Sequence, residues 1–84
     1  MLPSLADYER LVYSLQDRFS SIRHSALVVI RHGPAFAEVT GTIKFDDDIT
    51  LTVWEDLNFA RNVIQSYSYA VDRGGERLYW YDPQ

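Results

Sequence analysis

Hydrophobic positions follow two different periods along this chain, a helical one before residue 20 and an alternating one after residue 25. Ser4, followed three residues later by Asp7, matches the start of a helix, because a serine side chain can accept a hydrogen bond from an early backbone amide. The apolar residues after it recur three or four positions apart: Leu5, Tyr8, Leu11, Val12, Leu15 and Phe19. This stripe predicts one N-terminal helix that packs on the protein's own sheet.

The alternating segments predict strands joined by short turns. Residues 25–31 are rich in β-branched side chains, 32–35 form a turn, and 36–45 carry an apolar residue at every second position. A three-residue loop at 46–48 sets Ile43 opposite Leu51 and begins a third strand, which runs from 49 to about 55. A loop at 60–62 sets Val53 opposite Tyr69 in a fourth strand. The prediction is therefore a single α+β domain, 1–84, with one N-terminal helix packed on a five-stranded antiparallel meander.

The last hairpin, 67–82, holds five of the twelve aromatic residues. With Gly74 and Gly75 as a two-residue turn, two pairs of opposite charge face each other, Arg73 with Glu76 and Asp72 with Arg77. Continued without interruption, this register pairs Val71 with Leu78 and Tyr69 with Trp80. It therefore predicts that these four apolar residues belong to the core face.

Other large apolar residues are then expected on the opposite face. They are Leu27, Val29, Trp54, Tyr79 and Tyr81, and the registers place Ser68 between Trp54 and Tyr81. We expect Trp54, Ser68, Tyr79 and Tyr81 to form a binding surface. Five strands about 4.8 Å apart make a sheet roughly 24 Å wide, whereas one helix covers about 10 to 12 Å. The uncovered apolar surface predicts a homodimer or a tightly held protein partner.

Composition narrows the classes of partner. Twelve acidic residues against eight basic ones give a net charge of -4, which argues against a general phosphate-binding surface. The first half of the chain holds Arg18, Arg23, His24, Arg31 and His32, so a locally basic edge stays open as an alternative. Stacking of single-stranded nucleic acid on the surface that holds Trp54, Tyr79 and Tyr81 is a further alternative. The chain has no cysteine, and it shows no leader and no apolar run of membrane-spanning length. These features predict a cytoplasmic protein that is not in a membrane.

No catalytic or metal motif is present at a recognisable spacing. His24 and His32 stand at opposite ends of a predicted strand, about 20 Å apart, so they cannot serve one scissile bond. The acidic run 46–48 lacks the glycine and terminal glutamate of a calcium loop, which favours a solvated turn over a metal site. Glu38, Glu55 and Asp56 are candidate catalytic carboxylates only in the weak sense that any acidic residue is. We therefore predict no metal and no cofactor, and the sequence does not decide whether the protein is an enzyme.

The hairpin also carries a family resemblance. The segment Tyr67-Ser68-Tyr69, a charged turn with Gly74, and the run Leu78-Tyr79-Trp80-Tyr81-Asp82 together resemble the TumE-type toxins of type II toxin-antitoxin modules. The N-terminal helix and the alternating strands are similar as well, so the resemblance covers nearly the whole chain. The residues that match the family's hairpin motif are Tyr67, Tyr69, Tyr81 and Asp82.

The resemblance implies a toxin-like protein that is neutralised by a helix-turn-helix antitoxin. It implies action by binding, with RNA or the translation apparatus as the target. Members of the family commonly continue past the tyrosine-aspartate pair with a proline- and histidine-rich tail, whereas this sequence stops at Gln84. If that tail holds the active groups, the protein is a shortened or inactive relative. The alternative from a different class is a non-catalytic dimerisation or protein-interaction module.

Overall fold

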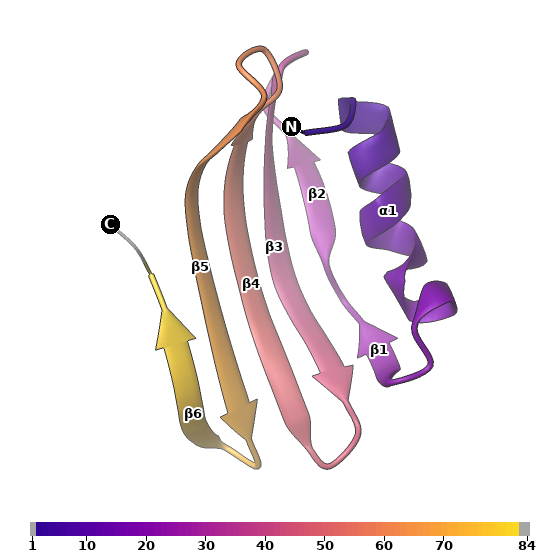
Figure 1. Cartoon of the computed structure of the whole chain (residues 1–84), viewed down its shortest axis with the longest axis vertical. Coiled ribbons are helices and arrows are strands. Elements are labelled where there is room, and N and C mark those ends of the chain that lie inside the picture. The colour runs from indigo at the N-terminus through magenta and orange to yellow at the C-terminus, as the bar shows by residue number, and fades with distance from the viewer. Residues whose placement is uncertain (1, 83–84) are drawn as a thin grey trace.

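One helix packs on an antiparallel sheet in the computed structural model, which describes residues 2–82. The elements are α1 (Leu5–Arg18), β1 (Ile22–Ser25), β2 (Val28–Arg31), β3 (Phe36–Phe45), β4 (Ile49–Asn58), β5 (Val63–Arg73) and β6 (Glu76–Tyr81). The sheet runs in the order β1, β3, β4, β5, β6, and β2 also pairs with β3 (Figure 1). The predicted α+β architecture is confirmed, with six strands in place of five.

The helix begins as the sequence predicts. Ser4 Oγ accepts a hydrogen bond from the Asp7 amide at 3.2 Å, and at the other end the Phe19 amide donates to the Leu15 carbonyl. Leu5 and Val12 are the buried helix residues. They join one core with apolar residues of the first four strands and of the link between β1 and β2: Ile22, Leu27, Val29, Ala37, Val39, Ile43, Val53 and Leu57.

The predicted first strand, 25–31, forms only from Val28 to Arg31 as β2, and the extra strand is β1, which begins at Ile22 before the predicted segment. Both strands pair with β3, Ser25 with Ile43 and Val28 with Thr40, although the register of β1 shifts between Ile22 and His24. The chain between β1 and β2 approaches Gly41 closely. A Cβ atom at Gly41 would lie 2.2 Å from the Ala26 carbonyl oxygen, so only glycine leaves room there.

The face predicted for Leu27 and Val29 is wrong. Val29 pairs with Val39, and both Leu27 and Val29 are 8% exposed within the helix-side core. The reason is the turn after β2, where five residues separate the last paired residues, Arg31 and Ala37. That odd number sets the two strands in phase, so that their apolar positions share one face.

The central hairpins follow the predicted registers. Ile43 pairs with Leu51 around the 46–48 loop, and Val53 pairs with Tyr69. Strand β4 extends three residues beyond the predicted end at 55, because its pairing with β5 resumes after a bulge opposite Leu57.

The last hairpin departs from its predicted register halfway along. Gly74 and Gly75 both have positive φ, and the pairs Arg73 with Glu76 and Asp72 with Arg77 form as predicted. A bulge then leaves Leu78 unpaired, and the partners become Val71 with Tyr79, Ala70 with Trp80 and Tyr69 with Tyr81. Because strand side chains alternate, this one extra residue turns the rest of β6 over. Tyr79 and Tyr81 therefore lie on the helix side, and Trp80 lies on the other side.

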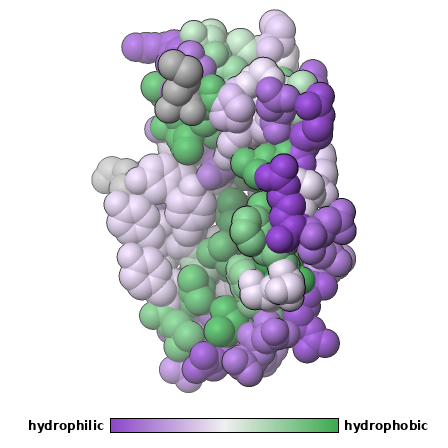
Figure 2. All heavy atoms as spheres, turned by 45° about the vertical axis from the view of Figure 1, so that its right-hand side comes forward, coloured by the Kyte–Doolittle hydropathy of each residue, from purple (hydrophilic) through white to green (hydrophobic). Residues whose placement is uncertain are grey.

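The helix covers only one end of the sheet. Figure 1 shows α1 beside β1 and β2, with β5 and β6 at the far edge. Every residue of β6 is exposed, including Tyr79, Trp80 and Tyr81 at 58%, 63% and 43%. Figure 2 shows a strip of hydrophobic side chains between hydrophilic residues on one side and paler, ring-bearing residues on the other. Between residues 2 and 82, no helix is long and apolar enough to cross a membrane.

Candidate functional site

A buried carboxylate lies on the helix side of the sheet. Glu55 occupies a core-facing position in β4 and is 9% exposed. Its two oxygens accept hydrogen bonds from two tyrosine hydroxyls, Oε1 from Tyr8 of the helix at 2.5 Å and Oε2 from Tyr69 of β5 at 2.5 Å. Hydroxyl donors to a carboxylate give short, strong hydrogen bonds, so this contact fixes the helix over the sheet.

Three tyrosines extend this site toward the uncovered edge. The Tyr67 ring lies 5.3 Å from the Tyr69 ring and 5.8 Å from the Tyr81 ring, measured between centroids. Both ring pairs are tilted, at interplanar angles of 39° and 33°, in the range of favourable aromatic contacts. We call Glu55, Tyr8, Tyr67, Tyr69 and Tyr81 together the tyrosine–glutamate cluster. It runs from the core to solvent.

The environment of Tyr8, Tyr67 and Tyr69 favours the protonated form of their hydroxyls. Burial, followed by the hydrogen bond to Glu55 and that group's negative charge, raises the pKa of both Tyr8 and Tyr69. The hydrogen bond between Tyr67 and Tyr81 raises the pKa of Tyr67. The cluster is therefore a carboxylate held by neutral donors. No Arg, Lys or His side chain described by the structure forms an ion pair with Glu55.

The structure divides the binding surface expected from the sequence. Trp54 pairs with Ser68 as predicted, but the β6 side chain that reaches Ser68 is Trp80, which pairs with Ala70 and whose Nε1 lies 3.4 Å from Ser68 Oγ. Tyr79 and Tyr81 lie on the opposite side of the sheet. The tyrosines of the hairpin motif, Tyr67, Tyr69 and Tyr81, meet in the cluster, whereas Asp82 follows β6 and is exposed.

The face opposite the helix has a smaller polar network. Trp54 Nε1 donates to Glu38 Oε2 at 2.6 Å, and the His32 ring lies 3.3 Å from Glu38 Oε1. These contacts, the Trp54 hydrogen bond before the His32 one, lower the pKa of Glu38. Because its indole N–H already donates to Glu38, the Trp54 side chain is held in place on this face. His32 is thus a partner of Glu38, and it lies apart from His24.

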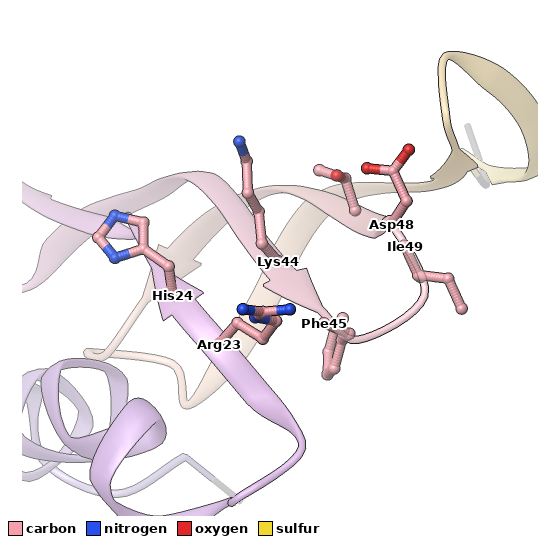
Figure 3. A pocket seen from close by; sticks show the side chains of 7 residues that line it. Arg23, His24, Lys44, Phe45, Asp48 and Ile49 are labelled. Carbon is pink, nitrogen blue, oxygen red and sulfur yellow. The ribbon is translucent and has the colours of Figure 1, made fainter.

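A basic pocket of about 470 Å³ opens where β1, β3 and β4 meet. It is lined by Arg23, His24, Lys44, Phe45, Asp48, Ile49 and Thr50. His24 pairs with Lys44 across the sheet, and both side chains stand on the same side of the strands (Figure 3). Arg23 lies 3.8 Å from Asp46 and Asp48 lines the pocket, so acidic groups offset much of its positive charge. The pocket therefore brings Arg23 and Lys44 together with acidic neighbours.

Sequence reasoning named Glu55 only as a weak candidate for a catalytic carboxylate and did not place it in the core. The signal was its phase, since Glu55 follows Leu51 and Val53 at the same core-facing spacing. A carboxylate in that position requires hydrogen-bond donors, and Tyr8 in the apolar stripe of the helix is one. No comparable signal marks the bulge at Leu78. Among the described residues, no group of three or more side chains is arranged to hold a metal ion.

Comparisons with protein-family models, with curated proteins and with solved structures returned no match.

Proposed function

We propose that this protein is a toxin-like component of a two-gene toxin-antitoxin module, which acts in the cytoplasm by binding. In this proposal the tyrosine–glutamate cluster binds its protein partner. The proposal combines the resemblance of the hairpin motif with one structural observation, the meeting of Tyr67, Tyr69 and Tyr81 beside Glu55. A motif whose tyrosines were needed only for packing would not require them at the uncovered edge, where Tyr81 is 43% exposed.

The cluster has the make-up of a recognition site. Tyrosines are enriched in the centres of interfaces, because each ring offers a large, rigid contact area together with a polar hydroxyl. Here the rings are held in place by their mutual contacts and by Glu55, so that little conformational freedom is lost on binding. The target of the toxin-like activity, RNA or the translation apparatus, follows by analogy with small toxins.

Growth of a bacterial host tests this proposal. The gene is induced alone, induced together with the adjacent reading frame, and induced as a Tyr67→Leu/Tyr81→Leu double variant. We expect a growth defect from the gene alone and its relief by the neighbour. The double variant is expected to lose that relief, because it lacks the partner surface. A Trp54→Leu/Trp80→Leu variant, altered on the opposite face, serves as the matched control and keeps the relief. Normal growth in every strain would refute the toxin proposal.

A second candidate is a dimerisation module, and the face opposite the helix favours it. Val28, Ile30, Phe36 and Trp80 are each at least 40% exposed on this face. Exposed apolar area of this kind is typical of contacts between subunits. Sedimentation at micromolar concentration tests the proposal. We expect a homodimer that Trp80→Glu converts to a monomer, and a monomeric wild-type protein would exclude it.

A further inference from the structure

We propose that the tyrosine–glutamate cluster binds a cationic side chain, an arginine or a lysine, from a basic segment of the partner protein. This inference rests on the proposed use of the cluster as a binding surface, and it adds the chemistry of the partner. Three observations support it: the uncompensated charge of Glu55, the geometry of the rings, and the charge balance of the chain.

The charge of Glu55 is the first observation. Its carboxylate is 9% exposed and is held by the Tyr8 and Tyr69 hydroxyls, which are neutral donors. The arginines that form ion pairs in the described chain are paired elsewhere, Arg10, Arg23, Arg31 and Arg77 with Asp7, Asp46, Glu9 and Asp72. A poorly solvated negative charge attracts a cation more strongly than an exposed one, because less water screens it.

The ring geometry is the second observation. Tyr69 connects the carboxylate to Tyr67, and Tyr67 in turn contacts Tyr81 at the uncovered edge. A cation over a tyrosine face is attracted by the negative charge of the π system. A hydroxyl that donates to a carboxylate makes its ring more electron-rich, which strengthens this attraction. An incoming cation would therefore contact the Tyr81 and Tyr67 rings first, and the negative charge of Glu55 would attract it from further inside.

The charge balance selects a basic partner over a second copy of this chain. The protein has a net charge of -4, so two copies that met at this surface would bring together two acidic molecules and two Glu55 carboxylates. A basic segment is attracted both by the overall charge and by the local site. Arginine fits better than lysine, because its planar guanidinium stacks on aromatic rings and is weakly hydrated.

Binding of a fluorescently labelled hexa-arginine peptide to the purified protein, followed by anisotropy, tests the inference. Glu55→Gln removes the carboxylate charge, and Asp47→Asn removes one charge from an exposed turn in which asparagine tolerates the positive φ of 62°. We expect Glu55→Gln to weaken binding about tenfold. Asp47→Asn should change it by less than about twofold, as screened surface charges do. Equal effects of the two variants would overturn the inference, because they would show attraction by net charge alone.

A second pair of variants keeps the test decisive if Glu55→Gln does not fold, as judged by circular dichroism. Tyr81→Leu and Trp80→Leu alter adjacent, exposed residues of β6 that lie on opposite sides of the sheet. Tyr81→Leu should weaken peptide binding several-fold and Trp80→Leu should not; the reverse order, or no binding by the wild-type protein, would overturn the inference. Peptide binding without any growth phenotype would refute only the toxin proposal. A partner-relieved growth phenotype without peptide binding would refute only this inference.

Discussion

The two ends of the helix-side sheet surface are filled by different kinds of side chain. Beneath α1 the strands present small and branched apolar residues, and Ala37, Val39 and Leu57 are at most 1% exposed. Beyond the helix, at β5 and β6, the same face presents tyrosines. Glu55 lies at the boundary and accepts hydrogen bonds from Tyr8 of the helix and from Tyr69 of the sheet.

The difference shows how a small domain manages a sheet that its helix cannot cover. Where the helix excludes water, dispersion and the hydrophobic effect stabilise the layers. Where it does not, the rings of Tyr67, Tyr69 and Tyr81 contact one another at tilted angles, and Tyr81 stays 43% exposed. The covered end therefore supplies most of the stability. The uncovered end offers an ordered surface whose residues are not all committed to the core.

The largest expected effect comes from replacing a leucine by alanine, and its size should differ between the two ends. Leu57→Ala removes a side chain that is 0% exposed, and we expect it to lower the free energy of unfolding by about 2 to 5 kcal/mol through the cavity that it leaves. Leu78→Ala makes the same chemical change at the bulge, where leucine is 49% exposed, and should cost less than about 1 kcal/mol. Urea unfolding measures both values. Similar losses would show that the uncovered end is buried in solution, for example by a second subunit.

The next largest loss of stability is expected at the link between β1 and β2, beneath the helix. Gly41→Ala brings a Cβ atom within 2.2 Å of the Ala26 carbonyl oxygen at a φ of +138°, and both the clash and the backbone strain destabilise the fold. We expect a loss of about 3 kcal/mol, at the upper end of the usual cost of such strain. Gly33→Ala is the matched control, because its φ is +93° and no atom lies within 4 Å of the added Cβ. In thermal unfolding, the Tm of the Gly41→Ala variant should lie well below that of Gly33→Ala.

The sequence predicted the regular stretches at both ends and missed the irregular ones, which at the covered end placed Leu27 and Val29 on the wrong face. Helix start, core alternation and the 46–48 loop follow from local patterns that packing then reinforces, and Ile43 meets Leu51 as expected. The predicted register of the last hairpin is wrong from Leu78 onward. Residues 78–81 are apolar at every position, so they give no alternation by which to detect a slip of one residue. The candidate site depends on that slip. Its tyrosines could be named from the sequence, but the face they share could not.

At the boundary between the two ends, the stabilising contribution of Tyr8 and Tyr69 is expected to fall at alkaline pH. Burial and the contact with Glu55 raise the pKa of Tyr8 and Tyr69, so above the ordinary tyrosine pKa of about 10 the unfolded chain loses protons that the folded protein keeps. Their contribution is full below pH 10 and declines above it, by less than the limiting slope of about 1.4 kcal/mol per pH unit for each tyrosine, because both side chains are partly exposed to solvent. Urea unfolding between pH 9 and 11 should show this slope, and Tyr8→Phe/Tyr69→Phe should reduce it. Tyr79→Phe removes a hydroxyl that does not donate to Glu55, so an equal reduction there would contradict the assignment.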